Sequence, residues 1–126
     1  MVVKSIHPRP QYVSENYSTT VATPTTTGVI GGFIANEPLT ITGMSASMSD
    51  TGSGAADTQI GVRVNNAATT VSGSPLIMDE TGAAGTGRAN FSQSLEIGDI
   101  VAVEITTAGA TSPTGLIVTL NVLKNF

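Results

Sequence analysis

The chain has 126 residues, of which five are basic and nine acidic, with a net charge of −4, no cysteine and no tryptophan. This length suits a single domain with a two-layer core. The absence of cysteine excludes a disulfide framework, a cysteine-ligated zinc site and a thiol nucleophile. The few basic residues are scattered, which argues against nucleic acid as a partner, because phosphate backbones demand clustered positive charge.

The longest apolar stretch, residues 29–35, is too short to cross a membrane and is interrupted by Gly31 and Gly32. The first five residues are not followed by an apolar run of signal-peptide length. We therefore predict no membrane partner and a chain that is made in the cytoplasm.

Residues 1–18 are predicted to form an extended N-terminal arm. Pro8 and Pro10 flank Arg9 and favour an extended, polyproline-like conformation. Such a segment is either a disordered terminus or an arm that orders against another subunit. The aromatic and aliphatic side chains gathered here favour the second interpretation. The candidate residues for contact with a partner subunit are Val2, Val3, Ile6, Arg9, Tyr12, Val13 and Tyr17.

Residues 19–126 are predicted to form a body of short β-strands. The β-branched run 19–27 is broken by Pro24 and suits an edge strand or a linker. Residues 28–35 are apolar enough to be covered on both faces, and their two glycines allow a bulge or a close backbone approach.

Residues 39–48 have the alternation of a strand with one irregularity. A shift of one residue near Gly43 brings the apolar side chains before and after it onto the same face, which predicts a β-bulge. The residues on that face are Leu39, Ile41, Met44, Ala46 and Met48.

Residues 59–71 have the pattern of a hairpin. Asn65 and Asn66 offer the positive φ angles that a tight turn needs, and residues 67–71 are the predicted return strand. The residues predicted to point inward before the turn are Ile60, Val62 and Val64.

The last third of the chain predicts further strands over residues 89–94, 100–105 and 116–122, with a turn at Gly98. Apolar residues nowhere recur at helical spacing over three turns. We predict an all-β body, an antiparallel β-sandwich or jelly roll of about eight strands, behind the N-terminal arm.

Candidates for chemistry are few. His7 is the only histidine and lies in the predicted arm, where no rigid element orients it as a general base. Asp79 and Glu80 are neighbours on a loop, whereas acid–base pairs flank a cleft. The loop carboxylates match no defined calcium-binding loop; they are Asp50, Asp57, Asp79, Glu80 and Asp99. We predict no catalytic residue, metal or cofactor, and a protein that is not an enzyme.

Three segments, residues 57–66, 95–104 and 114–122, combine a strand with a polar hairpin, a Gly-Asp turn into a strand, and a loop into a final strand. In this arrangement the chain resembles small β-sandwich proteins of tailed-bacteriophage virions. These include capsid decoration (cement) proteins and the jelly-roll tips of head and tail fibres. The resemblance implies a trimer at junctions between capsid subunits, and it brings no catalytic or ligand-binding residues.

The resulting hypothesis is a non-enzymatic decoration protein on the capsid surface, synthesised in the host cytoplasm. Its expected partners are the major capsid protein and two further copies of the chain. The alternative is a receptor-binding tip or adaptor of a phage fibre or tail. In that case the working surface would be the loops 50–57, 72–87 and 108–114.

Overall fold

The computed structural model is built from β-strands throughout its described part, which comprises residues 12–22, 24, 26–50, 53–54, 57–74, 76–78, 85–108, 110–111 and 114–125. Within these residues no helix has the length and hydropathy that a membrane span requires. The strands are β1 (Tyr12–Val21), β2 (Gly28–Ile34), β3 (Leu39–Met48), β4 (Ser53–Gly54), β5 (Thr58–Val64), β6 (Leu76–Met78), β7 (Gly85–Leu95), β8 (Ile100–Thr107), β9 (Ala110–Thr111) and β10 (Leu116–Asn125).

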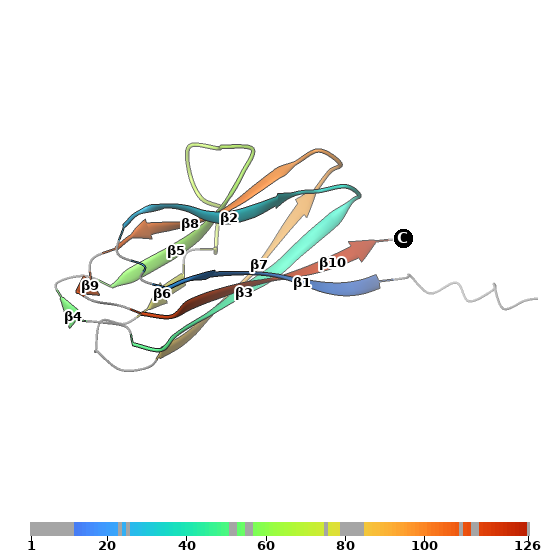
Figure 1. Cartoon of the computed structure of the whole chain (residues 1–126). Coiled ribbons are helices and arrows are strands. Elements are labelled where there is room, and N and C mark those ends of the chain that lie inside the picture. Colours follow the sequence, from blue (N-terminus) through green and yellow to red (C-terminus); the bar gives the residue numbers. More distant parts are fainter. Residues whose placement is uncertain are drawn as a thin grey trace, which may run out of the picture.

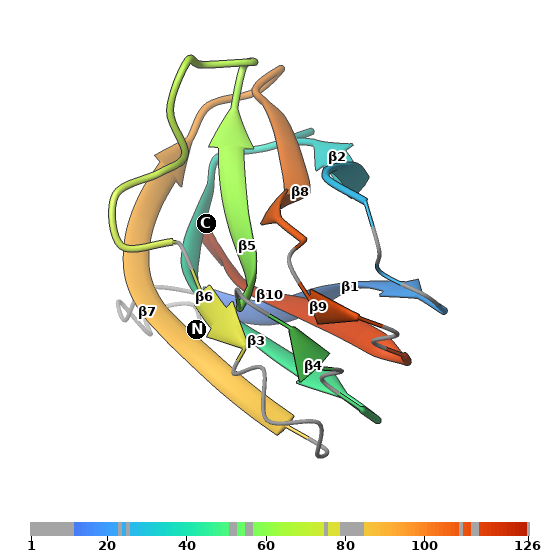
Figure 2. The same cartoon turned by 90° about the vertical axis from the view of Figure 1, so that its left-hand side faces the viewer.

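Eight strands form two four-stranded antiparallel sheets, in the orders β1-β10-β3-β7 and β2-β8-β5-β6. The sheets lie face to face as two layers (Figures 1 and 2). Strands of the first half of the chain pair with strands of the second half in reverse order: β1 with β10, β2 with β8, β3 with β7 and β5 with β6. This order is that of a jelly roll, in which two Greek keys wrap into two sheets. The predicted fold class is confirmed.

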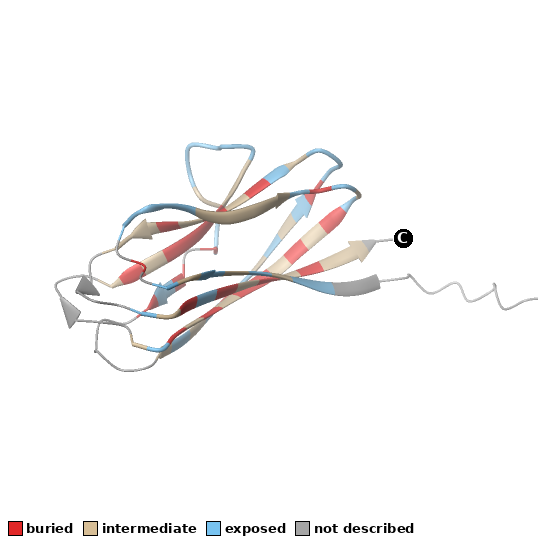
Figure 3. Ribbon diagram, viewed as in Figure 1, coloured by how far each residue is buried: buried red, intermediate tan, exposed pale blue. Residues whose placement is uncertain are grey.

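The core lies between the sheets, where alternate side chains of both layers are buried (Figure 3). All five apolar residues assigned to one face of residues 39–48 are buried, as are Ile60 and Val62 of β5. The alternation of β8 and β10 is also confirmed, because Val101, Val103 and Ile105 face inward together with Leu116, Val118, Leu120 and Val122. Hydrophobic alternation therefore assigned the faces of the long strands correctly.

Both predicted backbone irregularities are present. The adjacent residues Asn121 and Val122 of β10 pair with Gly43 and Ile41 of β3, so β3 carries the expected extra residue next to Gly43. The register between β2 and β8 shifts between Val29 and Gly31. At Gly32 an added Cβ would overlap the carbonyl oxygen of Val101, so only glycine allows β2 to approach β8 this closely.

The structure moves the expected boundary between arm and body. Residues 12–18 belong to β1, which pairs with β10 from Tyr12↔Asn125 to Val21↔Leu116. The physical reason is a period-2 alternation from Glu15 to Val21, in which the odd residues from Tyr17 are half-buried and the even residues are exposed. The remainder of the expected arm, residues 1–11, lies outside the described residues.

Two further expectations were wrong. Residues 28–35 are not covered on both faces, because Val29 and Ile34 are exposed on the outer face of an edge strand. Residues 67–71 are not a return strand. The N–H of Val71 instead donates a single hydrogen bond of 2.7 Å to the Val62 carbonyl, and the Ser74 hydroxyl accepts one of 3.1 Å from the Val62 N–H. These two hydrogen bonds give the main-chain N–H and carbonyl of Val62, on the free edge of β5, their partners without a further strand.

Candidate functional site: the open end of the sandwich

The side of the sandwich where the edge strands β1 and β2 face each other is closed by side chains. The N–H of Gly32 donates a hydrogen bond of 2.7 Å to the Tyr17 hydroxyl, and the Thr19 hydroxyl donates one of 2.9 Å to the Ile30 carbonyl. A Cβ at Gly31 would lie 2.7 Å from the Tyr17 hydroxyl, so glycine leaves room for the crossing. These contacts satisfy main-chain groups on an edge strand, groups that would otherwise be open to pairing with another chain.

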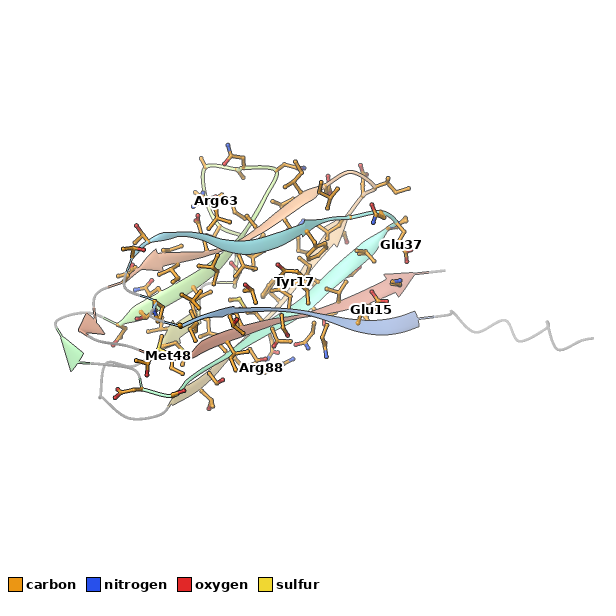
Figure 4. All side chains as sticks on the ribbon, viewed as in Figure 1. Glu15, Tyr17, Glu37, Met48, Arg63 and Arg88 are labelled. Carbon is orange, nitrogen blue, oxygen red and sulfur yellow. The ribbon has the colours of Figure 1, made fainter. Side chains whose placement is uncertain are left out.

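Beyond Tyr17 the two sheets separate and leave a hollow of about 300 Å³. Phe33, Leu39 and Val122 contribute to its apolar wall, and the Tyr17 ring lies 5.4 Å from that of Phe33. Figure 4 shows Glu15 on β1 and Glu37, in the β2–β3 connection, on opposite sides of this opening. We call this space the inter-sheet hollow. It lies at the end of the sandwich where β1 begins and β10 ends, which we call the open end (Figure 1).

Charges gather at the rim of the inter-sheet hollow. The Lys124 ammonium lies 3.0 Å from a Glu15 carboxylate oxygen and 3.6 Å from Oε1 of Glu37. The hydrogen bond to Glu15, reinforced by the charges of both glutamates, raises the pKa of Lys124. Oε1 of Glu37 is buried and lies beside the Lys124 ammonium, beyond ordinary hydrogen-bond distance of any donor among the described residues.

An exposed apolar cluster lies beside the inter-sheet hollow. Ile34 pairs directly with Ile100 across β2 and β8, and Ile97 lies in the turn before β8. All three are more than half exposed, at 58%, 54% and 69%. We call Ile34, Ile97 and Ile100 the apolar cluster. Exposed isoleucines that adjoin one another are typical of contact surfaces, whereas scattered ones need no explanation.

The apolar cluster sits on turns that are held rigidly. The Ala35 N–H donates to the Asp99 carbonyl at 2.9 Å, and the Gly98 N–H donates to the Ala35 carbonyl at 2.8 Å. The Asn65 amide and the Glu96 N–H donate to the Asp99 carboxylate at 2.9 and 2.8 Å, and these bonds lower the pKa of Asp99. A pre-ordered surface loses little conformational entropy when a partner binds.

The outer face of the β1-β10-β3-β7 sheet differs in character. It carries small polar residues, and Arg88 lies across the sheet over Gly43, where an added Cβ would be 3.3 Å from its guanidinium. Arg88 donates to the Asn121 side chain at 3.1 Å, and Asn121 donates to the Asn16 side chain at 3.0 Å. This chain of hydrogen bonds ties β7 to β1 across the sheet.

The structure describes only part of the predicted contact set. Tyr17 is half-buried and joins β1 to β2 within the chain, a role that its position in an expected arm did not suggest. Tyr12 and Val13 lie in β1, opposite Asn125 and Lys124. The other four, Val2, Val3, Ile6 and Arg9, lie outside the described residues.

The residues considered for catalysis or metal binding are a histidine and several loop carboxylates. Among the described residues, no three His, Cys, Asp or Glu side chains come close enough to hold a metal ion. Asp99 accepts hydrogen bonds that order the turn before β8. His7, Asp79 and Glu80 lie outside the described part of the chain.

Two of the three loops considered for a fibre tip meet at the opposite end of the molecule. β4 pairs with β9, and Asp50 forms a bridge with Thr114. Figure 2, which looks onto this end, shows β4 and β9 side by side in front of the sandwich. The pairing of these two-residue strands was not predicted, because segments this short carry no alternation and the contact arises from the topology.

No family model matches the sequence, and no curated protein matches it. Among solved structures, the chain is similar to one from Bacillus endospore appendages, described as disulfide-linked pili, with a TM-score of 0.51 and 15% identity over 94% of this chain and 91% of that chain. It is also similar to a chain in the acidic stable capsid structure of Helicobacter pylori bacteriophage KHP30, with a TM-score of 0.51 and 12% identity over 94% of each chain.

A third similar structure is a β-(1,4)-mannanase from Podospora anserina with GH26 and CBM35 parts, at a TM-score of 0.49 and 12% identity. There 90% of this chain matches 28% of that chain. Identities this low show the fold alone. The pilus and capsid chains are nevertheless matched over nearly their whole length, so each consists almost entirely of the fold seen here.

Proposed function

We propose that this chain is a non-enzymatic structural protein of a phage virion, a capsid decoration protein that binds the major capsid protein on the outside of the shell. The observation that carries the proposal is the match, over 94% of both chains, with a chain of the KHP30 capsid structure. The open end, with its apolar cluster and the start of β1, supplies a surface for contact with neighbouring subunits.

The pilus neighbour suggests a different assembly, but its subunits are described as disulfide-linked. The 126 residues contain no cysteine, so a covalent link of that kind is closed to them. Non-covalent contacts repeated over a symmetric shell fit the sequence better.

The mechanism follows from mass action. A partner that binds only the assembled shell stabilises that state by RT ln(1 + [L]/Kd). Each contact can be weak, because many copies act on one particle and a trimer binds through several sites at once. In this account the copies are joined through the open end of the body and residues 1–11, and the trimer as a whole binds the shell.

The alternative is a receptor-binding tip or adaptor of a phage fibre or tail. The β4–β9 pairing favours it, because it gathers two loops at one end of the sandwich, far from the start of β1 (Figure 1). In that case the loop end would bind the host cell, and the open end would attach the domain to the rest of the fibre.

The test is co-sedimentation of the purified chain with undecorated phage capsids and, in parallel, with intact bacterial cells. Saturable binding to capsids without binding to cells is the expected result. Binding to cells alone would replace the decoration proposal with the fibre-tip alternative. Binding to neither would overturn both.

A further inference from the structure

We infer that the inter-sheet hollow receives residues 1–6 from a second copy of this chain, so that copies are joined head to tail. The inference concerns contacts between copies of the chain and needs no shell. It therefore holds or fails separately from the proposed binding to a capsid.

The first argument is the chemistry of the inter-sheet hollow. Its wall is apolar, with Phe33, Leu39 and Val122, and its rim carries the carboxylates of Glu15 and Glu37. Lys124 lies between the two carboxylates, 3.0 Å from Glu15 and 3.6 Å from Glu37, so two negative charges at the rim face one positive charge. A fitting ligand is a short aliphatic segment that carries a positive charge. The inter-sheet hollow has a volume of about 300 Å³, which admits a few aliphatic side chains.

The second argument is the composition of residues 1–11. They contain three aliphatic residues, Val2, Val3 and Ile6, together with Lys4 and Arg9 and no acidic residue. Lys4 stands between the valines and Ile6, so its ammonium suits the excess negative charge of Glu15 and Glu37 at the rim.

The third argument decides between the same copy and a second one. β1 begins at Tyr12, three residues before Glu15 at the rim, so residues 1–6 would have to reverse direction to enter the hollow of their own copy. Pro8 and Pro10 fix their φ angles near −65° and favour extended conformations for the residues before them, which opposes a reversal between residues 7 and 10. Eleven extended residues reach up to about 36 Å, enough to span to a neighbouring subunit.

A contact of this kind is heterologous, because one copy gives residues 1–6 and the next gives its hollow. Heterologous contacts form a closed ring when the rotation between copies closes. A three-membered ring would be the trimer of the proposed function, with each hollow filled once.

The chain has no cysteine, so engineered thiols report directly on this contact. One variant carries Val3→Cys and a second carries Asn36→Cys, at an exposed residue that lines the inter-sheet hollow. The full-length variants are mixed and oxidised, and the disulfide between positions 3 and 36 is measured by mass spectrometry. The matched control replaces Asn36→Cys with Thr26→Cys, another exposed polar residue, located between β1 and β2 at the far end.

The expected result is a disulfide between positions 3 and 36 in high yield, with little between positions 3 and 26. Disulfides need Cα atoms within about 7 Å, so the bond reports close approach. Adding Lys4→Glu to the Val3→Cys chain should lower the yield several-fold, and Lys4→Arg should preserve it. Equal yields at positions 36 and 26 would overturn the inference. An internal disulfide as the main product of a Val3→Cys/Asn36→Cys chain would also overturn it, because the hollow would then be filled from its own copy.

Discussion

The two sides of the sandwich are closed by different means. On the side of β6 and β7, Leu76 and Met78 pack directly onto the backbone at Gly87, where an added Cβ would lie 2.9 Å from the Leu76 side chain. On the side of β1 and β2, the Tyr17 hydroxyl accepts a hydrogen bond from Gly32 and the Thr19 hydroxyl donates one to Ile30, beside the contact of the Tyr17 and Phe33 rings. These contacts extend along only part of the edge. The apolar side is sealed, whereas the polar side leaves the inter-sheet hollow. The difference indicates that a partner binds where the apolar core does not extend to the edge of the sandwich, which is at the inter-sheet hollow.

The largest predicted loss of stability comes from Gly32→Ala, on the side of β1 and β2. The added Cβ would overlap the Val101 carbonyl, so β2 must move away from β8. We expect a loss of about 3 kcal/mol of unfolding free energy, at the top of the usual range for overpacking, measured by urea denaturation.

Gly31→Ala is the control for Gly32→Ala. Its Cβ meets side-chain atoms of Tyr17 and Thr19, which can shift, so a smaller loss is expected. Equal losses for the two variants would show that the close approach at Val101 is not what holds β2 in place.

Leu76→Ala tests the sealed side. Leu76 is 3% exposed, and its truncation leaves a cavity between β6 and Gly87. We expect a loss of about 2–3 kcal/mol, measured in the same denaturation experiment. Ile77→Ala is the control on the same strand, because Ile77 is 57% exposed and its truncation should change stability by less than about 0.5 kcal/mol. Similar losses for both would contradict the assignment of the faces of β6.

Tyr17→Phe removes the hydroxyl that accepts the hydrogen bond of Gly32 but keeps the ring against Phe33. We expect a loss of about 1 kcal/mol and faster amide hydrogen exchange at Gly32, measured by NMR. Thr20→Val, at an exposed position of β1, should change neither. Unchanged exchange at Gly32 in Tyr17→Phe would mean that the edge of β2 is protected by something other than this side chain.

The smallest predicted effect is a pH dependence at the turn beneath the apolar cluster. Because hydrogen bonds lower the pKa of Asp99 in the folded state, its contribution is present above the unfolded value of about 3.9 and is lost as the pH falls through the folded value. Asp99→Asn should therefore lower stability at neutral pH, and the difference from wild type should shrink below pH 4. Asn65→Gly, which keeps a positive φ but removes the donor, should act in the same direction. A difference that stays constant from pH 7 to pH 3 would rule this origin out.

The sequence predicted those parts of the fold that alternation and glycine chemistry determine. The bulge next to Gly43, the close approach at Gly32 and the positive φ angles of Asn65 and Asn66 (52° and 57°) are confirmed. Each of these depends on residues that are neighbours along the chain, so a local pattern carries the information.

The candidate site was less predictable, because it depends on which strands become neighbours. The predicted arm included Tyr17. Its spacing from Thr19 and Val21 is nevertheless typical of a strand in which these three side chains share one face. That Tyr17 and Thr19 satisfy the edge of β2 follows only from the order of the sheets. The apolar cluster likewise combines one residue of β2 with two from the turn and start of β8.

The most direct test of the account is the association state of the full chain by sedimentation velocity at micromolar concentration, together with Ile34→Asp and Ile77→Asp. Both positions are exposed isoleucines, at 58% and 57%, but only Ile34 lines the open end. The account predicts a trimer for the wild type and for Ile77→Asp, and a monomer for Ile34→Asp. A wild-type chain that stays monomeric, or a trimer that Ile34→Asp leaves intact, would contradict the claim that the open end joins this protein to its neighbours.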